Sequence, residues 1–270
     1  MPATTSPAER RGGRRTAAGN PAGREGAPRE RGRVRRGPGA AEDAARRRAS
    51  AGRGRPLPRA FYARDPLTVA RAVLGRLLVC DSPAGRVSGL IVEVEAYRGA
   101  LDPASHAYRG RTARNATMFG ESGHAYLYFT YGMHHCLNLV TEAAGRASAV
   151  LVRALEPVDG IELMRARRGV IEATRLARGP GSVARALGLT RADDGLDLTR
   201  GPLWLSDLPP RRGGRRICRG PRIGIRVAVE RTWRFYLGGH ACVSVPRGPE
   251  PRSGKERGPR PASAPRLTPF

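Results

Sequence analysis

Ile91-Val92-Glu93-Val94-Glu95-Ala96-Tyr97 is the stretch that decides the fold, because apolar and polar side chains alternate along it. Alternation with a period of two predicts a β-strand, whose successive side chains point to opposite faces of a sheet. One face is apolar and should meet the core: Leu90, Val92, Val94 and Ala96. The other face projects two carboxylates and a phenol: Glu93, Glu95 and Tyr97. On the pattern alone, a strand with this face half in solvent is the commoner explanation.

The segments on either side of this stretch predict one mixed α/β domain. Asp65-Pro66 is typical of a helix start and Gly75 of its end, and further helices are expected to begin at Pro157 and Pro180. Strands are expected at residues 77–80, 86–97, 125–131, 136–140, 150–155, 223–229, 233–237 and 242–245. Because strands dominate and form local hairpins, we expect a mostly antiparallel sheet with helices packed around it.

The charge of the chain points to a polyanionic partner. The formal net charge is +26, and the two ends are rich in Arg, Gly, Ala and Pro. Residues 1–58 and 248–270 are predicted to be disordered tails, and 59–247 the folded domain. Residues 61–246 still carry 27 basic and 16 acidic side chains, so this domain is itself basic. Nucleic acid is the usual partner of such a protein. An anionic membrane, a ribosomal-type role or a GC-rich coding bias would also explain the composition.

Several classes of protein are disfavoured by what the sequence lacks. The four cysteines, at 80, 136, 218 and 242, have no zinc-ligand spacing, so we expect no metal and no other cofactor. No segment approaches the roughly 18 consecutive apolar residues of a membrane helix, and the N-terminus resembles no signal peptide. We therefore expect no membrane partner and a cytoplasmic protein, nucleoid-associated if it is bacterial.

A second alternating stretch, residues 126–133, is rich in aromatic side chains. Its last residues, Tyr131-Gly132-Met133, place two bulky side chains beside a glycine where the chain should turn back. Hairpin tips normally carry small polar residues, so these side chains suggest a wedge that enters between stacked bases. An aromatic strand of the core is the simpler alternative.

Ten short motifs occur in one order along roughly residues 60–247. They lie at 93–97, 106, 112–115, 118–119, 128–133, 136–138, 153–157, 179–180, 234–236 and 243–245. Each motif is weak alone, but the set closely resembles the alkyladenine (3-methyladenine) DNA glycosylase family. The resemblance implies a single α+β domain around a curved, mostly antiparallel sheet with a protruding hairpin. It also implies an enzyme that flips a damaged purine from duplex DNA and hydrolyses its bond to deoxyribose.

The resemblance also assigns roles to individual positions. Glu95 matches the general base that activates the attacking water, and Arg153 a residue that helps to hold this water. Four residues match the walls of the base pocket, the last of them restricting which purines fit: Tyr97, His106, Tyr128 and Asn138. Tyr131 matches the side chain that fills the gap in the duplex, and Met133 is expected beside it.

Contacts to the DNA backbone are expected from a loop and a helix start. Arg114 is the expected loop contact, and the turn before the Pro180 helix contributes Gly179, Gly181 and Ser182. Free N–H groups at a helix start can hold a phosphate, although ordinary helix capping explains this turn equally well. The sequence departs from the family pattern at Ala113 and at His134 and His135, and its basic segment 209–219 matches nothing in the family.

The sequence favours an enzyme that hydrolyses the bond between base and sugar without cutting the DNA strand. The chain has a single lysine, Lys255, in the predicted C-terminal tail. A glycosylase that cuts the strand needs an amine for a Schiff base, so we expect a monofunctional, monomeric enzyme acting on duplex DNA with a damaged purine. Its substrates are expected to be of the 3-methyladenine, 7-methylguanine and hypoxanthine type. A non-catalytic DNA-binding or damage-sensing protein and a ribosome-associated RNA-binding protein are the alternatives.

Overall fold

The computed structural model describes residues 54–130 and 134–244 of the chain. The expected wedge residues Tyr131 and Met133 and the turn between them lie outside these residues. So do almost all of the two tails that the sequence predicts to be disordered, and both expectations stay predictions.

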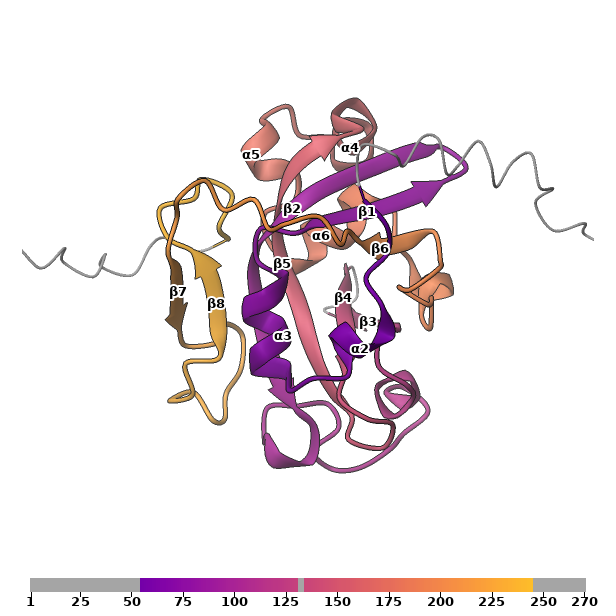
Figure 1. The fold of residues 1–270 in the computed structure, drawn as a ribbon, viewed down its shortest axis with the longest axis vertical. Helices are drawn as coiled ribbons and strands as arrows, with labels where there is room; N and C mark the ends of the chain where they lie inside the picture. The colour runs from indigo at the N-terminus through magenta and orange to yellow at the C-terminus, as the bar shows by residue number, and fades with distance from the viewer. Residues whose placement is uncertain (1–53, 131–133, 245–270) are drawn as a thin grey trace, which may run out of the picture. The chain divides into compact units, whose positions relative to one another are not determined.

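Within the described residues, eight strands form one curled sheet (Figure 1). The strands are β1 Leu77–Ser82, β2 Gly85–Arg98, β3 Ala125–Thr130, β4 His134–Thr141, β5 Ser148–Asp159, β6 Leu203–Leu205, β7 Ile217–Gly220 and β8 Arg234–Leu237. Their order is β3-β4-β5-β2-β1-β6, and β8 pairs with β2 and β7. Neighbouring strands run antiparallel. The expected α+β domain around a curved antiparallel sheet is confirmed.

Short helices flank the sheet. They are α2 Arg59–Tyr62, α3 Pro66–Val73, α4 Ile161–Arg168, α5 Ala173–Leu176 and α6 Pro180–Leu187. Helix α3 starts as the sequence predicts, because the Asp65 carboxylate accepts the N–H of Leu67 at 2.8 Å and Pro66 needs no hydrogen-bond partner for its nitrogen. In the described parts of the chain, no helix has the length and apolar character needed to cross a membrane.

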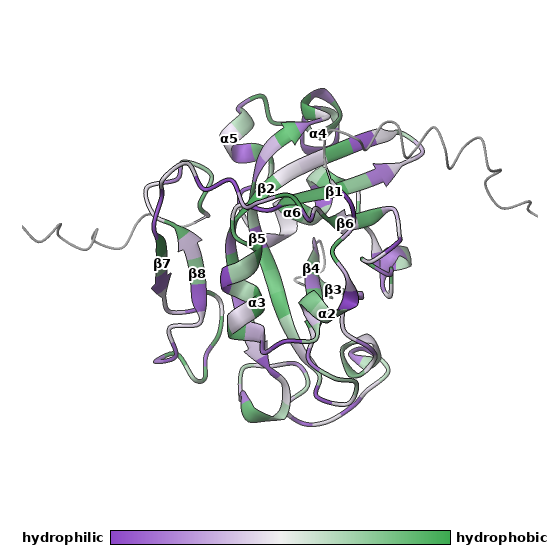
Figure 2. Ribbon diagram, viewed as in Figure 1, coloured by the Kyte–Doolittle hydropathy of each residue, from purple (hydrophilic) through white to green (hydrophobic). Residues whose placement is uncertain are grey.

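The central strand β2 is buried on both faces. Val92, Val94 and Ala96 are fully buried in the main core, as the alternation predicts, together with side chains of α3 and α6. Glu93 and Glu95, on the opposite face, are also fully buried. A half-solvated polar face is therefore wrong for this strand, because Arg153 of β5, Arg234 of β8 and the backbone of the loop after β7 contact the two carboxylates. Figure 2 shows the hydrophobic stretches along β2 and β5.

Three expected elements differ from the structure. The helix expected at Pro157 begins at Ile161, because Pro157 pairs with Gly89 at an irregularity of β5 and the strand continues to Asp159. Residues 223–229 and 242–244 are loops, although their apolar alternation is typical of strands. The first loop follows the sheet-edge strand β7, and its side chains line a cavity instead of pairing with a neighbour. Strands β6 and β7 are too short for the sequence pattern to reveal them.

Candidate active site

A pair of register shifts between β2 and β5 aims an arginine at the two buried carboxylates. Ile91 pairs with Leu155 and Glu93 with Ala154, so Val92 is an extra residue on β2. The next pair joins Val94 to Val152, which leaves Arg153 as the extra residue on β5. Such bulges re-aim side chains and are common beside active sites. Here the shifts place Arg153 on the same face as Glu93 and Glu95.

Glu95 is held by three donors from three parts of the chain. Its Oε1 accepts the Ile223 N–H at 2.7 Å and lies 3.2 Å from Nη1 of Arg153. Its Oε2 accepts the hydroxyl of Tyr97 at 2.8 Å. Burial raises the pKa of Glu95 above its ordinary value, while Arg153, the Ile223 amide and the Tyr97 hydroxyl oppose this rise. The result is a strengthened base whose ionised form has compensating partners.

Glu93 anchors the arginine from the other side. Its Oε1 accepts Nε of Arg153 at 3.1 Å and Nη1 of Arg234 at 3.2 Å. Its Oε2 accepts the Ser244 N–H at 2.6 Å. Arg153 thus bridges both carboxylates, and their proximity raises its pKa against the opposing effect of burial. A bridged guanidinium in this position is fixed in orientation as well as in charge.

A cavity of about 710 Å³ opens in front of this group. Tyr97, Arg153, His106, Tyr128 and Asn138, which the sequence predicts as site residues, all line the cavity. Glu95 itself is fully buried behind the cavity wall, one hydrogen bond from the lining Tyr97 and Ile223. The structure therefore brings together all the predicted catalytic and pocket residues, with Glu95 at the back.

One wall of the cavity is aromatic. The ring of His106 lies edge-on to Tyr128, with 4.5 Å between the ring centroids, and its Nδ1 is 3.1 Å from the Tyr126 hydroxyl. Burial and the charge of Arg114 lower the pKa of His106, which favours the neutral ring. Asn138 is fixed because its amide donates to the carbonyls of Tyr126 and Cys136. Neutral rings suit a flat, cationic or aromatic ligand.

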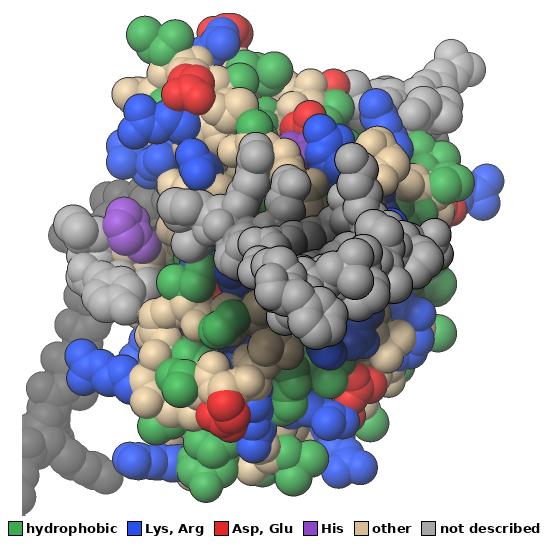
Figure 3. Space-filling view, turned by 90° about the vertical axis from the view of Figure 1, so that its left-hand side faces the viewer, with side chains coloured by type: hydrophobic (Ala, Val, Ile, Leu, Met, Phe, Trp, Pro, Cys, Tyr) green, Lys and Arg blue, Asp and Glu red, His purple; other side chains and the backbone are tan. Residues whose placement is uncertain are grey.

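Three of the four expected DNA-backbone residues line this cavity. Gly179, Gly181 and Ser182, at the start of α6, line it directly. Gly181 is required there, because a Cβ at this position would come within 2.9 Å of the His134 ring. Arg114 lies in the loop before β3 and donates from Nη2 to the Phe129 carbonyl at 2.9 Å. Figure 3 shows arginine side chains on several parts of the described surface.

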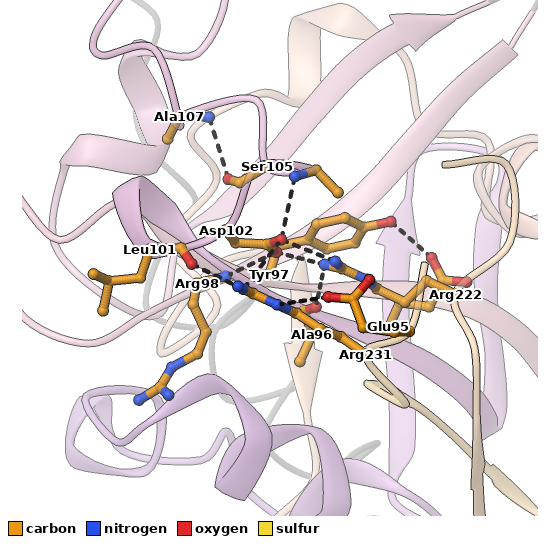
Figure 4. Close-up of polar contacts among 12 residues, drawn as sticks. Glu95, Ala96, Tyr97, Arg98, Leu101, Asp102, Ser105, Ala107, Arg222 and Arg231 are labelled. Carbon is orange, nitrogen blue, oxygen red and sulfur yellow. Dashed lines mark hydrogen bonds and ion pairs between the residues drawn. The ribbon is translucent and has the colours of Figure 1, made fainter. Parts of the chain in front are cut away.

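Four residues of the site received no role from the sequence, although one of them, Ser244, lies in the motif at 243–245: Asp102, Arg222, Ile223 and Ser244. Two of them act through backbone N–H groups, which no side-chain pattern reveals. Arg222 and Asp102 form a fully buried ion pair 120 residues apart in sequence, next to Tyr97 (Figure 4). The only usable signal was the departure of residues 220–225 from a simple strand pattern, because two glycines and a proline interrupt it.

No metal site is apparent in the part of the chain that the structure describes. Residues 54–130 and 134–244 contain no cluster of three or more His, Cys, Asp or Glu side chains that could hold an ion.

The sequence matches known proteins over the same region. The family described as methylpurine-DNA glycosylase matches residues 60–241. A protein of Rhodopseudomonas palustris (strain HaA2) is 50% identical over 193 residues, which cover 72% of this chain and 92% of the relative. One from Methanoculleus marisnigri is 50% identical over 191 residues, covering 70% and 98%. One from Streptomyces avermitilis is 48% identical over 205 residues, covering 73% and 94%. Each carries the name "Putative 3-methyladenine DNA glycosylase".

Fold, site and relatives agree on a class of protein. A buried carboxylate behind an aromatic cavity on a basic domain defines a hydrolytic DNA glycosylase, an enzyme of DNA repair. More narrowly, the chain belongs to the methylpurine-DNA glycosylase family. The resemblance drawn from its motifs is confirmed.

Proposed function

We propose that this protein excises alkylated and deaminated purines from duplex DNA, with Glu95 as general base and no cofactor. The observation that carries the proposal is the placement of Glu95 behind the aromatic cavity, with Arg153 compensating its charge. A buried carboxylate facing a polyanion repels it and has no stabilising purpose there, so a catalytic role explains its presence better than DNA binding alone.

The reaction follows from the charges at the site. Cleavage of the bond between the purine and C1′ develops positive charge on the sugar, as in glycoside hydrolysis. Glu95 takes a proton from water as the water oxygen bonds to C1′, and its negative charge stabilises the sugar cation. The base leaves with the electrons of the broken bond. A cationic methylated purine leaves neutral, whereas hypoxanthine leaves easily only after protonation.

Selectivity is proposed to come from the flipped position and from the walls. Extruding a base costs a few kcal/mol, and least for damaged or mispaired bases. Tyr97, His106 and Tyr128 would stack on the flipped purine through their rings, with the strongest attraction for a cationic one. Asn138 would exclude purines that carry the wrong exocyclic group. Tyr131 and Met133 would fill the gap in the duplex, and Arg114 with the start of α6 would hold the phosphates.

The product is proposed to be an abasic site in an intact strand. Lys255, the only lysine of the chain, lies outside the family match at residues 60–241. The matched region therefore offers no lysine for the Schiff base that strand cleavage requires. We propose that the protein works as a monomer, since one lesion occupies one cavity.

The test is base release by the purified protein from duplex oligonucleotides with one hypoxanthine or one ethenoadenine, and from methylated DNA. Glu95→Gln, prepared in the same way, is the matched control for contaminating glycosylases. We expect release by the wild type alone, strand breaks only after alkali and no borohydride-trapped adduct. Binding of both proteins to lesion duplex without release by either would instead establish a damage-sensing protein. A trapped adduct would overturn the monofunctional mechanism.

A further inference from the structure

A buried arginine that no motif singled out, Arg222, lies beside Tyr97 of the base pocket and directly precedes Ile223, a donor to the proposed general base. Nη1 and Nη2 of Arg222 donate to the two oxygens of Asp102 at 2.5 and 2.9 Å, and Nη1 also donates to the Ala96 carbonyl at 3.1 Å (Figure 4). Both side chains of the ion pair are fully buried. This two-point contact fixes the plane of the guanidinium, which a single hydrogen bond would not do.

Two aromatic rings also lie against this guanidinium. The Arg222 Cζ atom lies 4.6 Å from the ring centroid of Tyr97 and 5.2 Å from that of Trp233. Tyr97 is at once a wall of the cavity and the donor of a hydrogen bond to Glu95. The stacked arginine therefore sets the position of a ring that contacts both the cavity and the base.

The backbone beyond Arg222 extends the same contact to the carboxylate. Its next residue, Ile223, gives its N–H to Oε1 of Glu95 at 2.7 Å. The following residues of the loop, 224–227, line the cavity. These residues form no strand, so the position of the loop depends on contacts made at its ends. Arg222 is the anchor nearest to Glu95, and its contact with the Ala96 carbonyl ties the loop to β2 directly.

Stability alone is a weak explanation of this pair. Replacing a buried ion pair by well-packed apolar side chains is often neutral or stabilising, because desolvation offsets much of the attraction. The pair here occupies the one place where a fixed, planar cation can hold a pocket ring and a backbone donor together. A rigid apolar side chain would fill the space but could bind neither Asp102 nor the Ala96 carbonyl.

We propose that Arg222, fixed by Asp102, is a positioning residue that holds the Ile223 N–H and the Tyr97 ring on Glu95. This inference rests on the proposed function, because it concerns the same carboxylate. Arg222 touches neither the proposed water nor the purine, so its effect passes through Tyr97 and Ile223.

The proposal has a consequence for titration. The Ile223 N–H and the Tyr97 hydroxyl favour ionised Glu95, so loosening them raises the pKa of Glu95 further. Glu95 must be ionised to act as a base, so on acidification the activity is lost at a higher pH than in the wild type. The acid limb of the rate profile therefore moves to higher pH. The other ionisable groups around Glu95 stay in place in this comparison: Glu93 on β2, Tyr128 on β3, Cys136 on β4, Arg153 on β5 and Arg234 on β8.

Arg222→Lys is the sharpest variant, because it keeps the charge and removes the planar fork. The matched control is Arg231→Lys. Arg231 contacts the same Asp102, at 3.9 Å, and the same Trp233 ring, but it touches neither Tyr97 nor Glu95. Both variants are compared with the wild type in single-turnover base release on a hypoxanthine duplex across pH, at a temperature where melting curves show each to be folded.

We expect Arg222→Lys to lower the single-turnover rate constant roughly 10- to 100-fold, as misplacement by an ångström or less does. Its acid limb should lie at higher pH, and its affinity for a duplex with an abasic-site analogue should be unchanged. Arg231→Lys should match the wild type in all three. A folded Arg222→Lys with the rate and acid limb of Arg231→Lys would overturn the proposal, and so would a slower rate with an unmoved limb.

Two further measurements test the inference even if the wild type releases no base or if Arg222→Lys does not fold. The Glu95 carboxyl is titrated by ¹³C NMR, with its signal assigned by its loss in Glu95→Gln. A higher pKa in Arg222→Lys supports the proposal and an unchanged pKa overturns it, even if the wild type releases no base and the proposed function fails. If Arg222→Lys does not fold, Asp102→Asn, which breaks the two-point contact but keeps Arg222, must shift rate and titration in the same directions.

Discussion

The two walls of the cavity are built in opposite ways. The charged wall is Arg153, which lines the cavity, with Glu93 and Glu95 fully buried behind it, and each of the four carboxylate oxygens has a donor. The aromatic wall of His106 and Tyr128 is partly exposed and is held mainly by ring contacts. Buried ionic groups tolerate little change, because removing one partner leaves the other charge buried and unpaired. Aromatic rings can shift to suit different purines. From this difference we expect the charged wall to govern the rate and the aromatic wall the choice of substrate.

Arg153→Gln should give the largest combined loss, because it removes the cation shared by two buried carboxylates and leaves Glu95 with neutral donors only. We expect about 3–5 kcal/mol less unfolding free energy, measured by denaturant titration. The rate constant of base release should also fall roughly 10²- to 10³-fold, as when a preorganised electrostatic partner is removed. A variant that is destabilised but keeps the wild-type rate would show that the charged wall serves folding alone.

The same variant sharpens the account through pH. Burial raises the pKa of Glu95, so the wild-type rate should fall on acidification at a pH above the ordinary glutamate value of about 4.3. Arg153 opposes that rise, so Arg153→Gln should move the acid limb to still higher pH. The limb is measured under single-turnover conditions, since product release would mask it. A limb that moves to lower pH would contradict the assigned electrostatics.

Tyr128→Ala should change binding more than rate. Stacking of a base on an aromatic ring is worth about 1–3 kcal/mol, so affinity for lesion duplex should fall roughly 5- to 150-fold. Phe129→Ala is the matched control, because this neighbouring ring faces away from the cavity and is 46% exposed. Both are measured by competition between damaged and undamaged duplex. If both variants lost discrimination between damaged and undamaged duplex equally, the separate roles of the two walls would be contradicted.

Arg226→Gln should give the smallest effect. Arg226 lies exposed at the cavity and would neutralise about one phosphate. The slope of log affinity against log salt should then fall by about 0.9, while the rate at saturating enzyme stays unchanged. Arg200→Gln is the control, because Asp197 already pairs with this arginine at 2.8 Å. An unchanged slope in Arg226→Gln would show that the duplex does not contact this side chain.

The charged wall was only half predictable from the sequence. Alternation placed Glu93 and Glu95 on one face, and the family motifs supplied Arg153. The compensating shifts at Val92 and Arg153 that make them meet are invisible in one sequence, because each strand looks regular by itself. Burial of the polar face was missed for a similar reason. It depends on Arg153 of β5, Arg234 of β8 and loop residues more than 120 positions away, not on the strand's own pattern.

The aromatic wall was more fully predictable. Alternation along 126–129 correctly separated Tyr126 and Tyr128, which line the cavity, from Leu127 in the core. The same rule failed at 223–229, where Ile and Val alternate in a loop. Periodicity reports which side chains share a face, but a strand also needs a neighbour to pair with. Gly224 and the positive φ of Ala228 turn this segment away from the sheet.

The most direct test of the account compares the two carboxylates on β2. Glu95→Gln and Glu93→Gln are isosteric changes two residues apart, and both remove a charge that contacts Arg153. In single-turnover release of one lesion base, the account predicts a loss of roughly 10²- to 10⁴-fold for Glu95→Gln. Glu93→Gln should stay within about tenfold of wild type at temperatures where it is folded, because it holds no water and faces no substrate. Near wild-type release by Glu95→Gln, or a larger loss in Glu93→Gln, would contradict Glu95 as the base.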